Sequence, residues 1–137
     1  MNDPPVLYSS QRRVLPDDYA DLLRRCSLGS RRPVDDPARI GSMLDNANLH
    51  CSAWVGDRLV GMARSLTDFA YCCYLADLSV DEAWQRKGIG KELVRLTRSS
   101  LHPAAKIVLL AAPGAEEYYP RIGFIPHLSA WTLPAGE

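Results

Sequence analysis

The fold is decided by the stretch Leu75-Ala76-Asp77-Leu78-Ser79-Val80-Asp81-Glu82-Ala83-Trp84-Gln85-Arg86-Lys87-Gly88-Ile89-Gly90-Lys91-Glu92-Leu93. It predicts a strand, a short polar turn, and a helix that begins at a basic Gly-x-Gly segment. Glycine lets the backbone approach a ligand closely, because it has no side chain and tolerates unusual dihedrals. The first N–H groups of a helix lack partners within the helix, and the helix dipole favours negative charge beside them. With Arg86 and Lys87 at the same place, the stretch indicates a diphosphate site.

Two common phosphate-binding motifs do not fit this segment. A P-loop has four residues between its glycines and ends in Gly-Lys-Ser/Thr, whereas Gly88-Ile89-Gly90-Lys91-Glu92 has neither that spacing nor the metal-binding hydroxyl. A dinucleotide fingerprint reads Gly-x-Gly-x-x-Gly, and Leu93 stands where the third glycine belongs. The segment therefore indicates another class of diphosphate carrier.

The pattern that fits is Gln/Arg-x-x-Gly-x-Gly, present here as Gln85-Arg86-Lys87-Gly88-Ile89-Gly90 directly after the strand. It resembles the acyl-CoA-binding segment of the GNAT superfamily of N-acyltransferases. A second segment, Tyr118-Tyr119-Pro120-Arg121-Ile122-Gly123-Phe124, resembles the late Tyr-x-x-x-Gly-Phe signature of the same superfamily. The two motifs stand in the right order, about thirty residues apart, which makes the pair fairly specific. The resemblance covers about residues 49–133, and the N-terminal helices agree only in general layout.

The resemblance implies one GNAT-like domain over residues 1–137, of the α/β (α+β) class. We expect a mixed, mostly antiparallel sheet of six to seven strands, flanked by about four helices. The strands before and after the Gly-x-Gly helix are expected to be parallel, because such a connection is right-handed. In this superfamily those two strands splay apart, pantetheine lies between them, and the first strand carries a bulge, which here would fall near Leu78-Ser79-Val80. A bulge can re-aim a strand beside an active site.

Hydrophobic periodicity and turn residues predict where the elements lie. We expect a strand over 6–9, a helix from 16 to about 27, a helix capped by Asp35 or Asp36 with Pro37 in its first turn, a strand hairpin over 49–55 and 59–66, and a strand over 71–80. Further along we expect a helix from 88 to about 101, a strand over 107–111 buried on both sides, a short helix over 114–122, and final strands over 124–125 and 130–133.

The resemblance also implies acetyl-CoA as co-substrate and no metal. Backbone groups of Leu78, Ser79 and Val80 would contact pantetheine and the acyl oxygen. The diphosphate would lie against Gln85, Arg86, Lys87, Gly88, Ile89, Gly90 and Lys91. Tyr119 would be the acid that gives a proton to the departing thiolate, because a phenol is still protonated at neutral pH. Helical spacing predicts that Tyr119 faces inward and Tyr118 elsewhere, although Pro120 can end the helix early.

No residue stands out as the general base. Members of the superfamily often place Glu or His on the strand before the bulge, whereas alternation here puts Cys72, Tyr74 and Ala76 on the active-site face, none of them a good base. Tyr74 is expected to line the amine channel. Asp77 should point to the opposite face unless the bulge changes this. Asp77 then has one of two roles. It acts as a base or contacts the substrate, or it forms structural hydrogen bonds. An amine can also arrive already deprotonated through water.

The composition argues against several classes of partner. Sixteen basic and sixteen acidic residues cancel, so no net field attracts nucleic acid or an anionic membrane. The local pairs Arg12-Arg13, Arg24-Arg25 and Arg31-Arg32 are predicted to be solvated surface, and the three histidines lack zinc spacing. Four cysteines without C-x-x-C spacing indicate a reducing compartment. The N-terminus does not resemble a signal peptide, and no apolar run is long enough to cross a bilayer, so we expect a cytoplasmic protein. We expect no nucleic-acid or membrane partner, and a homodimer is possible.

The activity expected is transfer of an acetyl group from acetyl-CoA to a primary amine, by direct attack in a ternary complex. The acceptor is expected to be a small amine, a peptide terminus or a lysine, and the sequence does not select among these three. It also does not show whether an acyl group other than acetyl is transferred. Two alternatives stay open. A non-catalytic acyl-CoA-binding or regulatory module would keep the diphosphate segment without needing Tyr119, and a nucleic-acid-binding protein would use the arginine pairs.

Overall fold

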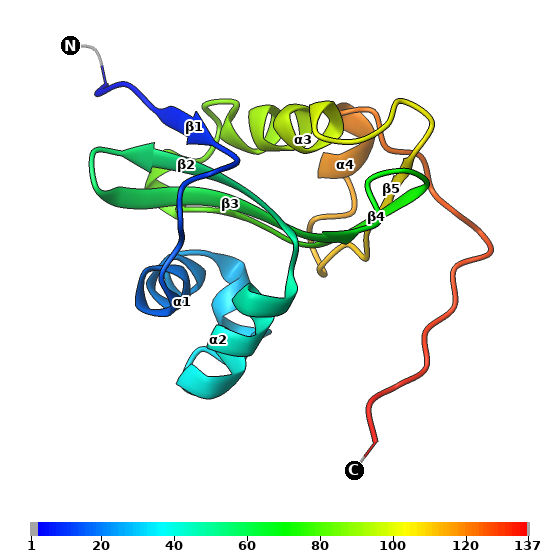
Figure 1. The fold of residues 1–137 in the computed structure, drawn as a ribbon, viewed down its shortest axis with the longest axis horizontal. Coiled ribbons are helices and arrows are strands. Elements are labelled where there is room, and N and C mark those ends of the chain that lie inside the picture. The colour runs from blue at the N-terminus through cyan, green and yellow to red at the C-terminus, as the bar shows by residue number, and fades with distance from the viewer. Residues whose placement is uncertain (1–2, 137) are drawn as a thin grey trace.

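The protein contains one sheet of five strands in the order β1-β2-β3-β4-β5, with helices on both faces (Figure 1). This is a computed structural model, and it describes residues 3–136. The strands are β1 (Leu7–Ser9), β2 (Leu49–Val55), β3 (Arg58–Thr67), β4 (Cys72–Val80) and β5 (Lys106–Val108). The helices are α1 (Pro16–Arg24), α2 (Pro37–Asn46), α3 (Ile89–Ser99) and α4 (Tyr118–Arg121), with 3₁₀ turns η1 (Ser27–Ser30) and η2 (Glu82–Trp84). The predicted single α/β domain with a mixed sheet and four helices is confirmed.

Strands β1 to β4 are antiparallel neighbours, and β5 pairs with β4 in parallel. The β2–β3 hairpin agrees closely with the alternation in the sequence, because β2 has the predicted bounds and β3 is one residue longer at each end. Gly56 in the connecting turn has a φ of 59°, a left-handed conformation that glycine adopts without steric cost.

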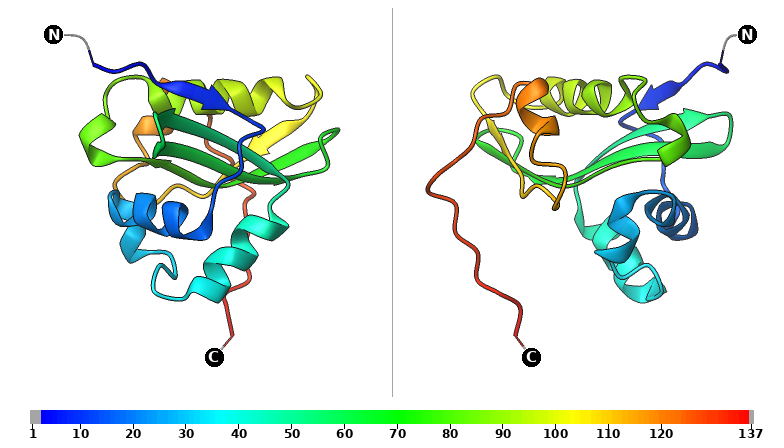
Figure 2. Two further views of the ribbon diagram at one scale, coloured as in Figure 1. Left: turned by 60° about the vertical axis from the view of Figure 1, so that its left-hand side comes forward. Right: turned by 180° about the vertical axis from the view of Figure 1, so that it is seen from behind.

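Helices α1 and α2 cover one face of the sheet, and α3 and α4 cover the other (Figures 1 and 2). The core is accordingly in two parts. The α1/α2 face buries Tyr19, Leu22, Leu23, Ile40 and Met62. The α3 face buries Cys51, Val60, Cys73, Ile89 and Leu93. Among residues 3–136 no helix is long and apolar enough to cross a bilayer, and the longest, α3, has 11 residues.

Local signals explain the helix ends. The Asp36 side chain caps α2 by accepting a hydrogen bond from the Arg39 N–H at 3.2 Å, and Pro37 occupies the first turn as predicted. Helix α1 ends at Arg24 rather than near residue 27, because the chain turns there into η1 and folds back. The return is close: a Cβ at Gly29 would lie 2.7 Å from the Leu23 carbonyl oxygen.

The sheet ends earlier than the sequence predicts. Residues 3–136 form five strands instead of six or seven. Residues 124–136 form none, and after Phe124 the chain runs away from the body of the protein (Figure 2). The strand predicted over 107–111 is β5, which ends at Val108, and it is not buried on both sides, since Val108 is 46% exposed. In the part of the chain that the structure describes, no later strand covers β5, so its outer edge stays open. The helix predicted over 114–122 is reduced to the four residues of α4.

Candidate active site

Strands β4 and β5 pair over three residues and then separate. Cys72 to Tyr74 pair with Lys106 to Val108, and no ladder pair follows. A pocket of about 360 Å³ lies where the strands part, lined by residues 75–78 of β4 and residues 109–112 beyond β5. The splayed parallel strands expected from the sequence are therefore present.

The bulge in β4 lies at Ala76, not near residues 78–80 as the sequence predicts. Strand β3 pairs with Asp77 and, one residue further on, with Leu75, so Ala76 is the extra residue. An extra residue shifts the alternation of faces beyond it. Asp77 therefore lies on the same face as Tyr74 rather than the opposite one, and both line the pocket.

Asp77 is a buried carboxylate, 2% exposed, that accepts hydrogen bonds from three side chains. Its Oδ1 accepts from Arg32 Nε at 2.6 Å. Its Oδ2 accepts from Arg64 Nε at 2.7 Å and from the Tyr19 hydroxyl. Arg32 Nη2 also donates to the carbonyl of Ala76 at 3.1 Å, so the loop after η1 is fixed to the bulge of β4.

The electrostatics of Asp77 favour a structural role over that of a base. Burial opposes its ionisation, but the hydrogen bond and charge of Arg64, with Tyr19 and Arg32, outweigh this and hold its pKa below the ordinary 3.8. Burial and the charge of Asp77 raise the pKa of Tyr19 well above 10.0. A carboxylate with a lowered pKa and three donors is a weak proton acceptor at neutral pH.

The Gly-x-Gly segment forms the N-terminus of α3. Gly88 is the N-cap, and its φ of +82° lies in the region that favours glycine. It provides no side-chain cap, and the N–H groups of Gly88, Ile89 and Gly90 donate to no protein group among residues 3–136. Lys91 is exposed in the first turn of the helix. Unpartnered N–H groups at the positive end of a helix dipole can bind an anion.

The polar side chains before α3 are partly engaged with the protein. Gln85 Nε2 donates to the Val80 carbonyl at 3.1 Å, and Lys87 Nζ lies 2.7 Å from Asp3 Oδ2 at the surface. Arg86 is exposed and has a φ of +64°, a conformation that is uncommon outside glycine. The positive charge predicted for this segment is therefore present, and part of it is balanced by Asp3.

The last residues of β4 face different surroundings. Leu78 lines the pocket and also packs against the core of the α3 face. Ser79 is 1% exposed and pairs with Met62 of β3, and its hydroxyl is buried without a partner among residues 3–136. Val80 pairs with Gly61 and is half-buried next to α3.

Helix α4 presents two adjacent phenols to two different places, as the sequence predicts. Tyr119 lines the pocket, whereas the Tyr118 hydroxyl lies against Gly90 at the start of α3. The two rings meet edge to face with centroids 5.4 Å apart, and Tyr119 packs in the same way on Phe124 at 5.5 Å. Burial raises the pKa of Tyr119 above 10.0, Tyr118 adds to the rise, and the charge of Arg32 opposes it. The phenol of Tyr119 therefore keeps its proton at neutral pH.

The structure thus brings Tyr74, Asp77, Leu78 and Tyr119 together around one pocket. No residue of the segment 85–91 lines this pocket. The link between the two regions is α4, whose neighbouring phenols touch both of them.

Comparison with known proteins identifies the family. A family model described as the acetyltransferase (GNAT) domain matches residues 34–132, which is more than half of the chain. The chain belongs to the GNAT acetyltransferase family. This acetyltransferase is 32% identical over 143 residues to an uncharacterized, ycf52-like N-acetyltransferase of Prochlorococcus marinus, with 99% of this chain and 74% of that protein covered.

Two further proteins show how far the likeness extends. A probable acetyltransferase of Glycine max is 38% identical over 133 residues, which are 87% of this acetyltransferase but only 51%, about half, of the soybean protein. Among solved structures, an aminoglycoside N-acetyltransferase in complex with CoA has the same fold, with a TM-score of 0.72. That likeness covers 98% of this chain and 97% of the other, at 13% sequence identity.

The residues of this acetyltransferase fit an acyl-CoA. A diphosphate needs donors, and unpartnered N–H groups stand at the start of α3. It also needs a close approach, and open space surrounds the position of a Cβ at Gly88. An extended pantetheine arm needs a free strand edge, which β4 offers beyond Tyr74. Within residues 3–136, no group of three or more His, Cys, Asp or Glu side chains is placed to hold a metal ion.

The sequence alone does not reveal the arginines of this site. It predicts that Arg25 and Arg32 lie on a solvated surface, whereas their side chains are only 19% and 24% exposed and bind buried carboxylates, Asp81 and Asp77. It does not single out Arg64 at all. The available signal was an aspartate inside an apolar strand, because a buried carboxylate requires a cationic or hydrogen-bonding partner.

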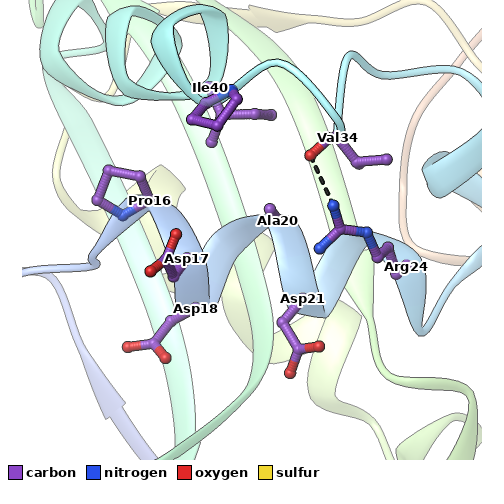
Figure 3. Close-up of a pocket in the computed structure, with 9 residues that line it drawn as sticks. Pro16, Asp17, Asp18, Ala20, Asp21, Arg24, Val34 and Ile40 are labelled. Carbon is purple, nitrogen blue, oxygen red and sulfur yellow. Dashed lines mark hydrogen bonds between the residues drawn. The ribbon is translucent and has the colours of Figure 1, made fainter.

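A second cavity of about 360 Å³, between α1 and α2, lies apart from this site (Figure 3). Arg24 Nη2 closes one side by donating to the Val34 carbonyl at 2.8 Å. The carboxylates of Asp18 and Asp21 point away from Ile40 in Figure 3. The cavity shares no lining residue with the pocket at the split of β4 and β5, so we assign it no part in the chemistry.

Proposed function

We propose that this chain transfers an acetyl group from acetyl-CoA to a primary amine, by direct attack in a ternary complex. The observation that carries the proposal is the split of β4 and β5, with Tyr119 on its pocket and unpartnered N–H groups at the start of α3 nearby. Membership of the GNAT acetyltransferase family supports the same reaction class. Acetyl-CoA supplies the activated acetyl thioester.

The chain's own groups then divide into two tasks. The N–H groups of Gly88, Ile89 and Gly90, with Arg86 and Lys91 beside them, bind and orient the diphosphate. Backbone groups near the end of β4, around residues 78–80, orient the thioester arm. These groups position the co-substrate, and they take no part in proton transfer.

The phenol of Tyr119 holds the proton that the leaving sulfur requires. Its ring is clamped edge to face by Tyr118 and Phe124, so its hydroxyl has a fixed direction. Burial keeps this hydroxyl protonated, which suits an acid rather than a base. No free general base lines the pocket, because the single carboxylate there, Asp77, is bound to two arginines and Tyr19.

Two measurements test this function. Calorimetry with acetyl-CoA and with CoA should detect one site, and release of thiol should require an added primary amine. With both substrates varied, the initial rates should give intersecting double-reciprocal lines, since both must be bound together. Parallel lines would indicate an acyl-enzyme intermediate and would exclude direct attack. Tight CoA binding without turnover on any amine would favour the non-catalytic acyl-CoA-binding module instead.

We also propose a homodimer. Residues 124–136 expose large apolar side chains, among them Ile125 at 87%, Trp131 at 92% and Leu133 at 96%, and the outer edge of β5 is open. Exposed apolar groups and unpaired edges are features that proteins usually cover. Light scattering should give twice the chain mass of 15.2 kDa, and a mass equal to one chain would exclude the dimer.

We also propose that the protein resides in a reducing compartment such as the cytoplasm. The four cysteines are all free, and three of them, Cys26, Cys51 and Cys73, are buried. Thiols of this kind persist where disulfides do not form. Protein isolated from its native source, denatured and alkylated without prior reduction should carry four alkylated cysteines by mass spectrometry, and a lower count would point to an oxidising location.

A further inference from the structure

The pocket at the split of β4 and β5 carries a positive formal charge. Three arginines line it, Arg31 and Arg32 from the loop after η1 and Arg64 from β3. The acidic residue on its wall is Asp77, and the remaining lining residues are uncharged. Three cations and one anion leave a formal charge of +2. This is unusual for an amine-binding pocket, because an ammonium group is itself a cation.

The carboxylate of Asp77 is not available to a ligand. Oδ1 is bound by Arg32, and Oδ2 is bound by Arg64 and Tyr19. Binding an ammonium group to Asp77 would require breaking a buried ion pair, which is strongly unfavourable when it leaves a charge unpaired. The pocket therefore has no carboxylate to spare for a cationic acceptor.

Arg31, in contrast, is free to bind a ligand. Its side chain is exposed, it lines the pocket, and its guanidinium has no ion pair or hydrogen bond among residues 3–136. The backbone that carries it is fixed, because Arg32 Nη1 donates to the Arg31 carbonyl at 3.0 Å and Arg32 itself is bound to Asp77. The structure thus holds an unpaired guanidinium at the pocket wall, on a loop fixed to β4.

We propose that the acceptor is an anionic amine, a primary amine with a carboxylate or phosphoryl group within a few bonds of its nitrogen, and that Arg31 binds that anionic group. This inference rests on the function proposed above. A guanidinium presents parallel N–H donors that match a carboxylate or a phosphate, which gives both affinity and orientation. With the anion on Arg31, the amine can extend toward Leu78 and Tyr119, which line the same pocket.

The positive pocket also explains how the amine can react without a dedicated base. Nearby positive charge disfavours the ammonium form, so a bound amine loses its proton to water more readily than the same amine in solution. The arginines of the pocket would then promote deprotonation of the amine, which a general base would otherwise carry out. The anionic group of the acceptor keeps the whole molecule attracted to the site.

The same charge argues against polycationic acceptors. Aminoglycosides carry several ammonium groups, and the CoA-bound structure of similar fold is an aminoglycoside N-acetyltransferase. Similar fold does not imply similar acceptor, because the acceptor is chosen by the side chains of the pocket. In this chain those side chains carry a net positive charge, so we expect polyamines and aminoglycosides to be poor acceptors.

Matched amines test the proposal. Thiol release from acetyl-CoA is measured with phenylalanine and with phenethylamine, which differ by one carboxylate, and with spermidine as the polycation. Rates are compared at equal concentrations of neutral amine. Short peptides with an acidic or a basic second residue distinguish a peptide source of the anion from a free amino acid. We expect kcat/KM to be at least about tenfold higher for the anionic member of each pair, as for one charge-assisted hydrogen bond.

Arg31→Gln removes the proposed contact, and Arg39→Gln is the matched control. Arg39 is exposed on α2 and does not line the pocket. Arg31→Gln should lower kcat/KM about tenfold for anionic amines and little for phenethylamine, and Arg31→Lys should recover part of the loss. Arg39→Gln should behave as the unaltered protein does.

The outcomes separate this inference from the function beneath it. Preference for spermidine, or an equal loss on all amines in Arg31→Gln, overturns the anionic acceptor while leaving acetyl transfer intact. If no amine is acetylated, the proposed function fails. Calorimetry of phenylalanine and of acidic peptides on CoA-saturated protein then decides the anion site alone. Binding that Arg31→Gln removes would support it, and an absence of binding would refute it.

Discussion

Arg64 and Asp77 face each other across β3 and β4, with Arg64 Nε 2.7 Å from Asp77 Oδ2, at the pair that borders the bulge of β4. Without the extra residue at Ala76, Asp77 would point to the α3 face and Arg64 would lack its partner. The bulge therefore does two things at once. It brings the carboxylate to the pocket side of the sheet, and it lets Arg32 reach the same carboxylate from the loop after η1.

Asp77→Asn is expected to destabilise the protein strongly. The amide cannot balance two guanidinium groups, and breaking a buried ion pair by removing one partner costs about 3 to 5 kcal/mol. Urea unfolding measures the free energy directly. The matched control is Asp57→Asn, because Asp57 pairs with Arg12 at 3.4 Å on an exposed surface and should contribute less than about 1 kcal/mol. Similar losses in the two variants would contradict the structural role of Asp77.

The free energy of unfolding should decrease over two separate ranges as the pH is lowered. Burial lowers the pKa of His50 below its ordinary 6.5, so the unfolded chain takes up this proton first as the pH falls through 6.5, and stability decreases. The pKa of Asp77 lies below 3.8 in the folded protein despite its burial, so its contribution is complete at neutral pH and is lost as the pH falls below 3.8.

His50→Gln separates the two ranges. Its Nε2 is buried without a hydrogen-bond partner among residues 3–136, so replacement should remove most of the decrease between pH 7 and 5 and leave the decrease below 3.8. Chemical denaturation across this pH range measures both. His127→Gln, in the exposed segment after α4, is the control and should leave the curve as it was. An unchanged slope in His50→Gln would contradict the assignment.

Much of this fold could be predicted from local patterns. Alternation and turn residues predict the β2–β3 hairpin closely, and the Gly-x-Gly segment predicts the start of α3 to within one residue. The bulge could not be predicted at the right residue, because it depends on which residue of β3 stands opposite Asp77. The resemblance to a family suggested that a bulge exists, but the register was a property of two strands together.

The pocket arginines illustrate the same limit. Arg32 and Asp77 are 45 residues apart, so no local spacing indicates that they meet. Paired arginines in a loop are usually solvated, so their spacing alone predicts an exposed surface. Residues 130–133 show the opposite error, because a strand predicted to belong to the sheet is exposed and unpaired. These residues have the composition of a strand, but in this structure they have no neighbouring strand to pair with.

Tyr119→Phe should lower kcat by about a hundredfold or more, while the KM for acetyl-CoA changes little. The substitution keeps the ring and its packing on Tyr118 and Phe124, and it removes only the proton that the leaving sulfur needs. Steady-state rates over pH 6 to 10 are the measurement. Tyr71→Phe is the control, since Tyr71 is 77% exposed and lies away from the pocket. An unaltered kcat at every pH would remove Tyr119 as the acid.

Gly90→Ala should both destabilise the protein and weaken acetyl-CoA binding. A Cβ at this position would overlap the Tyr118 hydroxyl, so either α3 or the ring must move. Such overpacking costs about 1 to 3 kcal/mol. Because Tyr118 packs on Tyr119 at 5.4 Å, the displacement also disturbs the proposed acid. Gly41→Ala is the matched control: a Cβ there meets no atom within 4 Å, and α2 should gain a few tenths of a kcal/mol or more in helix propensity.

The double variant Gly90→Ala/Tyr118→Phe tells steric overlap from loss of the ligand's close approach. Removing the Tyr118 hydroxyl makes room for the new methyl group, so the free energy of unfolding should recover by more than Tyr118→Phe alone changes it. If acetyl-CoA affinity recovers as well, Gly90 matters through Tyr118. If stability recovers and affinity does not, the ligand itself requires the bare backbone at Gly90. A Gly90→Ala protein with unaltered stability and unaltered affinity would contradict both readings and the packing of α4 on α3.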